Sequence, residues 1–197
     1  MSQISKRIIG LTGGIGTGKT TVSKYLASHH KLPVLDADIY ARDAVQLGSP
    51  VLGKIRERYG KNILLPDGTL NRKRLGETVF SHHDERQWLE QQIHPYVRSR
   101  FQSELYTLAD PTVVLVIPLL FEAGMNDLVT QIWVVNCSPE QQKRRISDRD
   151  QLTQEQALAR IKSQLPLEEK VAKADVILNN TFTPEFLLRQ VDLALRS

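Results

Sequence analysis

Residues 13–20 of the chain read Gly-Gly-Ile-Gly-Thr-Gly-Lys-Thr, and this stretch decides the fold. An apolar segment at 7–12 precedes it, and Val22, Tyr25 and Leu26 follow it at the spacing of one helix face. The pattern predicts a strand, a glycine loop and a helix. Such a loop turns its backbone N–H groups toward a triphosphate, while the positive end of the helix faces the phosphates.

Two side chains at the end of the loop favour a nucleoside triphosphate with its metal ion over a dinucleotide. Lys19 brings a mobile positive charge to the β- and γ-phosphate oxygens, and Thr20 offers a hydroxyl to Mg²⁺. The alternative is a chance match to the pattern G-x-x-x-x-G-K-[ST] in an unrelated turn. The predicted strand before the loop and helix after it argue against chance, because this context is the test of the motif.

The length and composition are those of one globular domain without disulfides. The chain has 197 residues, of which 41% are hydrophobic, enough to bury a core. Its single cysteine, Cys137, lies in an apolar run and excludes both a disulfide framework and a cysteine-based zinc site. The N-terminal segment has no signal-peptide pattern, and no long apolar span occurs. We therefore expect a cytoplasmic protein without a membrane partner.

The net charge points to a small anionic ligand and not to nucleic acid. The formal charge is +4, and the basic residues are dispersed along the chain. A nucleic-acid-binding surface more often shows a continuous basic stripe with stacking aromatic residues, and only 6% of the residues here are aromatic. An anionic ligand suffices to explain the positive charge.

Five apolar runs predict buried parallel strands, since they are rich in Val, Ile and Leu and lack strict alternation. They cover residues 7–12, 32–36, 112–117, 131–137 and 175–179. Helical patterns lie between them, and Ser138-Pro139 and Thr183-Pro184 are start signals for two helices. The order predicts a doubly wound α/β fold with a five-stranded parallel sheet, whose ligands bind at the carboxyl ends of the strands.

Two stretches interrupt the alternation of strands and helices. Between Asp38 and Asp110 the sequence has helical patterns and no strand-like run, and a charged excursion separates the fourth and fifth strands. We therefore predict one domain with a helical insertion and a mobile helical lid. The insertion would bind the molecule that accepts the phosphoryl group. The predicted core covers residues 1–60, 111–138 and 171–197, the insertion about residues 61–110 and the lid about residues 139–170.

Asp36 and Asp38 follow the second predicted strand at the ligand-binding edge of the sheet. Extended geometry would point both carboxylates the same way, and a carboxylate there can orient an acceptor hydroxyl and take its proton during phosphoryl transfer. Alternatively, either residue caps the helix predicted after it. For Asp36, a cap, an indirect metal contact and catalysis all stay open. For Asp38, the choice of catalysis depends mainly on the family resemblance below.

Arg145 and Arg149 stand four residues apart and so share one face of a predicted helix. Guanidinium groups on a closing lid clamp phosphate oxygens and stabilise the charge of the transition state. The alternative is a solvated helix face, on which Asp148 and Asp150 pair with the arginines. The pattern alone leaves both interpretations open.

The histidines do not form a metal-binding pattern. The pairs at 29–30 and 82–83 lack the third ligand that a metal centre needs. His94, before Pro95, is typical of a structural residue when it is taken alone. We assign no metal to histidine.

The motifs taken together resemble the dephospho-coenzyme A kinase family. Beside the glycine loop they are Asp36-Ala37-Asp38 with Ala41-Arg42, Asp67-Gly68 through Arg72, His94-Pro95, Pro118-Leu119-Leu120-Phe121-Glu122, Arg145 with Arg149-Asp150, and Arg160 through Gln164. They follow the family's order over nearly the whole chain. Many kinases share the loop, whereas its combination with Asp-Ala-Asp, His-Pro and Pro-Leu-Leu-Phe-Glu is specific. Thr17 and Thr20 stand where serine is frequent, which keeps the hydroxyl.

The resemblance implies a P-loop kinase fold and ATP-dependent phosphorylation of the ribose 3′-hydroxyl of dephospho-CoA, with Mg²⁺. It implies that Asp38 is the catalytic base, that Lys19 acts on the phosphates, and that Arg145 and Arg149 act from the lid. The implied ATP-binding residues are Gly14, Ile15, Gly16, Thr17, Gly18, Lys19, Thr20, Thr21 and Asn180, with Thr20 on the metal. The implied acceptor-binding residues are Asp38, Arg42, Arg72, His94 and Glu122.

Some questions stay open at this point. Either Asp36 or Glu122 would help Thr20 and water to hold Mg²⁺, and a monomer is the simplest expectation for the oligomeric state. Another small-molecule P-loop kinase, for nucleosides or nucleotides, would share every feature except the His-Pro and Pro-Leu-Leu-Phe-Glu motifs. A GTP-binding switch would need an Asn-Lys-x-Asp motif and an Asp-x-x-Gly motif, and the chain has neither.

Overall fold

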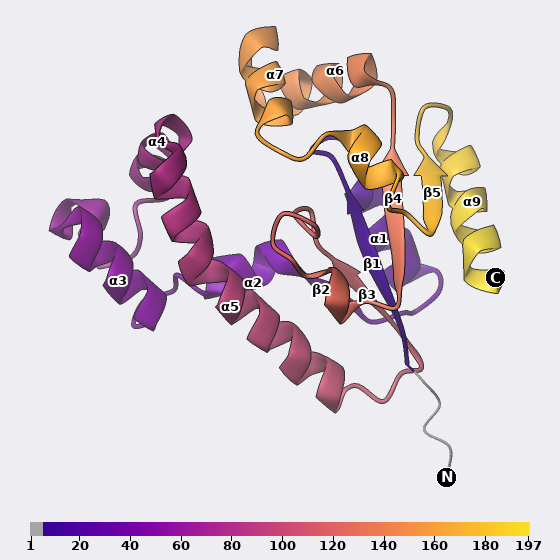
Figure 1. The fold of residues 1–197 in the computed structure, drawn as a ribbon, viewed down its shortest axis with the longest axis horizontal. Coiled ribbons are helices and arrows are strands. Elements are labelled where there is room, and N and C mark those ends of the chain that lie inside the picture. Colours follow the sequence, from indigo (N-terminus) through magenta and orange to yellow (C-terminus); the bar gives the residue numbers. More distant parts are fainter. Residues whose placement is uncertain (1–5) are drawn as a thin grey trace. The chain divides into compact units, whose positions relative to one another are not determined.

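The computed structural model describes residues 6–197, apart from the side chains of Phe80 and Ser81. Residues 1–5 lie outside this description, and with them the start of the predicted 1–60 core segment and part of the N-terminal segment in which we expect no signal peptide. The described chain forms two units. The sheet unit consists of residues 6–36 and Leu108–Ser197, and the helical unit is Ala37–Thr107 (Figure 1).

The sheet unit is built on five parallel strands. They are β1 (Arg7–Gly13), β2 (Val34–Asp36), β3 (Thr112–Val116), β4 (Gln131–Asn136) and β5 (Val176–Asn179), in the spatial order β2-β3-β1-β4-β5. The predicted five-stranded parallel α/β fold is confirmed. The second strand begins at Val34 and not at residue 32, because Pro33 has no N–H to donate to the ladder and only its carbonyl accepts from Val114. The central position of β1 puts the glycine loop in the middle of the carboxyl edge.

Helices cover both faces of the sheet, which explains why the strands read as continuous apolar runs. Figure 1 shows α1 (Lys19–Ser28) and α8 (Leu167–Val171) on opposite faces. Helix α9 (Pro184–Arg196) packs beside α1 and buries Leu187 and Val191 in the same core cluster as Trp133. The position of the loop is therefore fixed by a fully packed sheet.

Between β4 and β5 the chain forms a pair of helices and then α8. Helix α6 (Pro139–Asp150) is capped by Ser138, whose side chain accepts from the N–H of Gln141. Helix α7 (Gln154–Lys162) begins with a capping box of Thr153 and Gln156. Before them, a short 3-10 turn, η2 (Asn126–Leu128), follows β3. The predicted helix starts at Ser138-Pro139 and Thr183-Pro184 are confirmed, since α6 and α9 begin at these prolines.

The helical unit has its own apolar core. Its elements are α2 (Ala37–Asp43), α3 (Pro50–Tyr59), η1 (Lys61–Ile63), α4 (Arg72–Ser81) and α5 (His83–Thr107). Val45, Val51 and Ile55 pack in one cluster with Ile63 and Leu75, so residues before 61 share the core of this unit, which begins at Ala37. Within residues 6–197, no helix combines the length and the hydrophobicity needed to cross a bilayer.

Glu85 links two helices of this unit. Its carboxylate accepts hydrogen bonds from Nε and Nη2 of Arg58 at 2.7 and 2.9 Å and from the Tyr59 hydroxyl at 2.6 Å. The contact with Arg58, followed by that with Tyr59, lowers the pKa of Glu85 to about 2. The carboxylate therefore stays charged in the folded chain at pH values where it would take up a proton in the unfolded chain.

We expect Glu85→Gln to lower the stability of the chain at neutral pH and to reduce its loss of stability in acid. A carboxylate with a depressed folded pKa contributes stability above its unfolded pKa of about 4.3, and this contribution is lost as the pH falls through the folded pKa. Urea unfolding at several pH values between about 7 and 2 measures the effect. The difference from the wild type should shrink across this window, whereas the exposed Glu57→Gln control should show no such trend. A constant difference for Glu85→Gln would contradict the ion pair.

Candidate nucleotide site and acceptor pocket

The loop after β1 runs so close to its neighbours that side chains would not fit. Gly13, Gly16 and Gly18 have φ angles of 142°, 77° and 108°. A Cβ atom on Gly13 would lie 2.5 Å from the carbonyl oxygen of Val135, and one on Gly16 would lie 2.8 Å from Cγ1 of Ile146. The loop is thus a bare backbone cradle, and this is the geometry in which successive N–H groups bind phosphate.

Positive charge gathers at the start of α1. Gly18 is the N-cap residue and offers no capping side chain, and the first turn contains no acidic residue. The partial positive charge of the helix end therefore faces the loop. Lys19 Nζ donates to the carbonyls of Gly13 and Gly14 at 2.9 and 2.8 Å, so its ammonium group lies over the loop. These features fit a polyphosphate.

Three amide side chains hold the loop. Nε2 of Gln142 donates to the carbonyl of Ile15 at 2.8 Å, and Oε1 of Gln164 accepts from the N–H of the same residue at 2.9 Å. Nδ2 of Asn180 donates to the carbonyl of Thr17 at 2.7 Å. Gln142 and Asn180 are buried. The family resemblance implies that Asn180 binds ATP near the adenine, and this role stays a prediction beside the observed contact with the loop.

The two predicted lid arginines have different partners. Nη2 of Arg145 donates to the carbonyl of Asn180 at 3.2 Å. Arg149 binds Asp150 through Nε and Nη2 at 2.7 and 2.9 Å, and Arg160 donates to the same carboxylate at 2.7 Å. Arg149 first, and then Arg160, lower the pKa of Asp150. Among the described contacts, Arg149 is thus paired as the solvated-face alternative expects.

The helical unit contains a pocket of about 350 Å³. Its lining combines apolar side chains with three charged residues, and consists of Asp38, Ala41, Arg42, Val45, Leu70, Arg72, Leu75, Gly76, Val79, Leu89 and Ile93. Nη2 of Arg72 donates to the carbonyl of Arg42 at 3.3 Å, which joins the start of α4 to α2. Asp38, Arg42 and Arg72, three of the residues that the family resemblance assigns to the acceptor, therefore line one pocket.

Asp38 lies within the first turn of α2 and not before it. It is an exposed residue on the helix, two positions after the end of β2. Asp38 is therefore not the N-cap residue of α2, as the capping alternative would require.

The other two predicted acceptor residues lie elsewhere. His94 is in α5, and the described lining of the pocket includes its neighbour Ile93 but not His94 itself. Burial lowers the pKa of His94 and outweighs the opposite effect of Glu90, which favours the neutral imidazole. Glu122 belongs to the sheet unit, where its carboxylate binds a buried lysine.

That lysine, Lys170, is fully buried. Its Nζ lies 2.8 Å from Oε1 of Glu122 and donates to the carbonyl of Pro118 at 3.0 Å. The same Glu122 oxygen accepts from the N–H of Leu165 at 2.9 Å, and the Thr12 hydroxyl donates to Pro118 at 3.3 Å. This network joins the segment after β3 to the chain between α7 and α8, beside the strand that leads into the glycine loop.

Removal of the Glu122 charge should lower the free energy of unfolding more than removal of the Lys170 charge. Glu122→Gln leaves a fully buried ammonium group without its counter-ion, and we expect a loss of about 2–3 kcal/mol, below the range for fully buried pairs because Glu122 is 24% exposed. Lys170→Met removes the buried charge and leaves a carboxylate that water can reach, so it should cost less. Urea unfolding of both variants and of the double variant measures the order. An equal or larger loss for Lys170→Met would contradict it.

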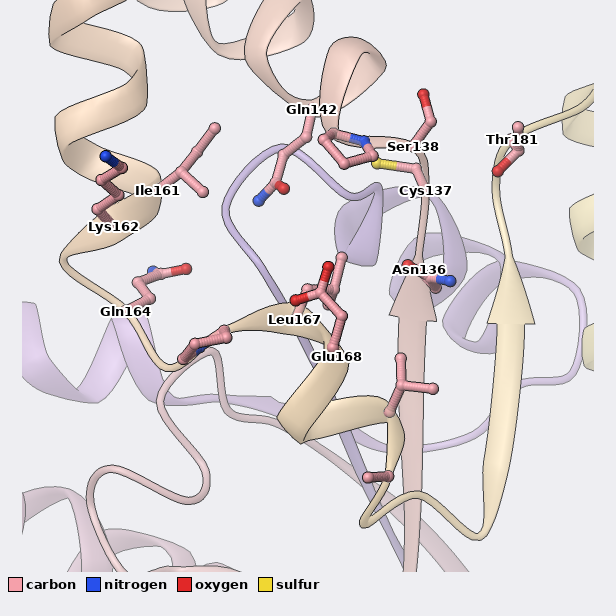
Figure 2. Close-up of a pocket in the computed structure, with 14 residues that line it drawn as sticks. Asn136, Cys137, Ser138, Gln142, Ile161, Lys162, Gln164, Leu167, Glu168 and Thr181 are labelled. Carbon is pink, nitrogen blue, oxygen red and sulfur yellow. The ribbon is translucent and has the colours of Figure 1, made fainter.

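A larger cavity of about 860 Å³ lies in the sheet unit, among the ends of β4 and β5, α6, α7 and α8. Figure 2 shows Gln142 and Gln164 in this cavity, one from α6 and one from the segment after α7. Cys137 also lines it, and burial raises the pKa of this thiol above its ordinary value. The cavity therefore borders two of the three amides that hold the loop, Gln142 and Gln164.

The strand order, the glycine cradle on the central strand, the uncapped α1 and Lys19 define a P-loop kinase, a phosphotransferase that uses a nucleoside triphosphate. A shikimate kinase from Bacteroides thetaiotaomicron, 17% identical with a TM-score of 0.55, covers 97% of this chain and 99% of its own and shares the fold.

Comparison with known proteins narrows this class to one family. The family model for dephospho-CoA kinase matches residues 7–185. A dephospho-CoA kinase of Trichormus variabilis is 62% identical over 98% of this chain and 98% of its own, and one of Synechococcus elongatus is 53% identical over 96% and 91%. The solved dephospho-CoA kinase from Campylobacter jejuni is 31% identical, with a TM-score of 0.71 over 97% of this chain and 96% of its own. The chain belongs to the dephospho-CoA kinase family, and the predicted resemblance is confirmed.

Proposed function

We propose that the chain transfers the γ-phosphoryl group of ATP to the ribose 3′-hydroxyl of dephospho-CoA, giving CoA and ADP in the last step of coenzyme A synthesis. The observation that carries this proposal is the glycine cradle with Lys19 over it, in a chain of this family. We also propose a cytoplasmic monomer whose partners are the two substrates, without nucleic acid or membrane.

ATP would bind along the loop. The N–H groups of residues 14–21 would hold the phosphates, and Asn180 would lie near the adenine. Thr20 is exposed at the start of α1, so its hydroxyl is accessible to a hydrated Mg²⁺ ion. When bound, Mg²⁺ neutralises charge on the β- and γ-phosphate oxygens. Thr20, water and ATP would hold the ion, with help from either Asp36 or Glu122, because Mg²⁺ keeps several waters and takes few protein ligands.

The acceptor would bind at the pocket of the helical unit. Dephospho-CoA joins an adenosine and an aliphatic arm through a diphosphate, so its site needs apolar walls together with positive charge. The pocket offers Val45, Leu75 and Leu89 as walls and two guanidinium groups, Arg42 and Arg72, for phosphate oxygens. Asp38 would accept the proton of the attacking hydroxyl. His94 and Glu122 stay as acceptor-binding candidates on the family resemblance alone.

Residues 139–170 would act as a lid that carries Arg145 and Arg149 to the phosphates and excludes water. Arg149 would then exchange its contact with Asp150 for a contact with the triphosphate. Asp150 also accepts from Arg160, so this carboxylate would keep a cationic partner after the exchange. The geometry thus offers a low-cost way to release Arg149.

We expect Arg149→Ala to lower kcat about tenfold or more and to change the KM for dephospho-CoA little, because an interaction made mainly in the transition state appears in kcat. Arg144→Ala is the matched control, since Arg144 is an exposed arginine of the same helix without an assigned role. Steady-state kinetics of the two variants measure the difference. Equal kcat values would contradict a catalytic role and would favour the alternative, in which Arg149 belongs to a solvated helix face.

A coupled assay of ADP release tests the function itself. We expect turnover with dephospho-CoA and little with AMP, adenosine or pantothenate, and NMR of the product should show the new phosphate on the ribose 3′-oxygen. Faster turnover of AMP or adenosine would overturn the proposal in favour of a nucleoside or nucleotide kinase. Nucleotide hydrolysis that no acceptor accelerates would argue for a nucleotide-binding switch.

A further inference from the structure

The backbone of Ile15 is held from both ends of the proposed lid. Gln142, in the first turns of α6, binds its carbonyl, and Gln164, two residues after α7, binds its N–H. Figure 2 shows that the two side chains come from different segments. The backbone of one loop residue, Ile15, therefore contacts both ends of the α6–α7 pair, through Gln142 near the start of α6 and Gln164 just after α7.

The two hydrogen bonds differ in what a phosphate can do to them. Gln142 donates to a carbonyl, and a phosphate oxygen, which is only an acceptor, cannot replace it. Gln164 accepts from an N–H, the kind of group that a glycine loop offers to phosphate. Oε1 of Gln164 and a phosphate oxygen would thus compete for the same proton of Ile15. The charged oxygen is the stronger acceptor of the two.

The two glutamines also differ in burial, and the difference again makes Gln164 the one that can be displaced. Gln142 is 4% exposed, and a Cβ on Gly14 would lie 2.5 Å from its Nε2, so its amide is packed against the loop. Gln164 is only partly buried and borders the cavity, so its amide has room to leave. Next to it, the N–H of Leu165 is bound to Glu122, which holds the chain that enters α8. Release of Gln164 would therefore detach the end of α7 from the loop, while Gln142 still holds α6 and Glu122 still holds the chain that enters α8.

We propose that Gln164 is a positioning residue that couples the lid to the bound nucleotide. A phosphate oxygen accepts the hydrogen bond from the Ile15 N–H in place of Oε1 of Gln164. The C-terminal end of the α6–α7 pair is then released from the loop, while Gln142 keeps the N-terminal end attached. This inference rests on the proposed function, since it requires ATP on the loop and a lid at 139–170.

Two substitutions of Gln164 test the competition by opposite changes in ATP affinity. Gln164→Glu puts a carboxylate at the same reach, which binds the N–H more strongly and repels the triphosphate, so the Kd and KM for ATP should rise about tenfold or more. Gln164→Ala removes the competing acceptor, so both constants should stay within about threefold of the wild type or fall. A bond that only supports the structure would give the reverse order. The matched control is Gln154→Glu, which adds the same charge at an exposed position of α7 and should change neither constant.

The affinity is measured by calorimetry with a non-hydrolysable ATP analogue and Mg²⁺, beside the KM from the coupled assay. Thermal melts check that each variant is folded, and Gln164→Ala alone decides the question if Gln164→Glu does not fold. A loss of affinity in Gln164→Ala of more than about threefold, or a wild-type affinity in Gln164→Glu, would overturn the inference. If the wild type itself does not bind the analogue, the proposed function fails. If it binds and only the order of the variants differs, the inference alone fails.

Discussion

Lys19→Ala is expected to lower kcat about a hundredfold or more while the chain stays folded. In the structure the ammonium group lies within 2.9 Å of two carbonyls of the glycine cradle, where a bound triphosphate would place its β- and γ-oxygens. Negative charge grows on these oxygens during phosphoryl transfer, and a preorganised cation stabilises it without reorganisation. Lys19 is the first residue of α1, and alanine is a good helix former, so the fold should tolerate the change.

The control for this variant is Lys24→Ala, which removes the same charge from an exposed position of the same helix. Activity is measured by ADP release at saturating ATP and dephospho-CoA, and the folded state by a thermal melt. Lys24→Ala should keep near wild-type turnover. If Lys19→Ala kept more than about a third of the activity, its role at the phosphates would be wrong.

The parts of the fold that were predictable depend on local patterns. The glycine loop, the apolar strands and the Ser-Pro and Thr-Pro helix starts are each defined by a few consecutive residues. The structure forms them at the predicted places, although β2 begins at Val34 and not at residue 32. The residue at which the helical unit begins could not be predicted from such local patterns. An amphipathic helix such as α3 shows which face is apolar but not which core receives it, and here Val51 and Ile55 join the core of residues 63–75.

In the candidate site, too, some residues have a local sequence signal and others do not. The loop residues stand out because their chemistry follows from spacing. Asp36 and Asp38 stand out as two carboxylates around the end of β2, but the choice of Asp38 as the base depends mainly on the family resemblance. Gln142 and Lys170 give no such signal, since a glutamine that binds a loop 127 residues away, or a lysine buried against Glu122, looks like any other polar residue of a helix. Spacing also predicts that Arg145 and Arg149 share a face, but the choice of Asp150 as partner depends on side-chain positions that spacing does not define.

Asp38→Asn is expected to lower kcat about a hundredfold or more and to leave ATP binding intact. The amide keeps the size of the side chain and cannot accept the proton of the attacking hydroxyl. Asp38 is exposed in the first turn of α2 and lines the pocket with Arg42 and Arg72, so the change should cost little stability and should spare the guanidinium groups. Asp36→Asn, two residues earlier at the end of β2, is the matched comparison and should have a smaller effect on the chemical step.

The measurement for this pair is a single-turnover experiment with enzyme in excess of ATP, so that product release does not hide a loss in the chemical step. Calorimetry with the ATP analogue follows binding in parallel. A loss of transfer with normal nucleotide affinity in Asp38→Asn supports a proton acceptor, whereas a matching loss of affinity points to a binding role. If Asp36→Asn abolishes transfer and Asp38→Asn is mild, the base is Asp36, and Asp38 belongs to the pocket as a binding residue only.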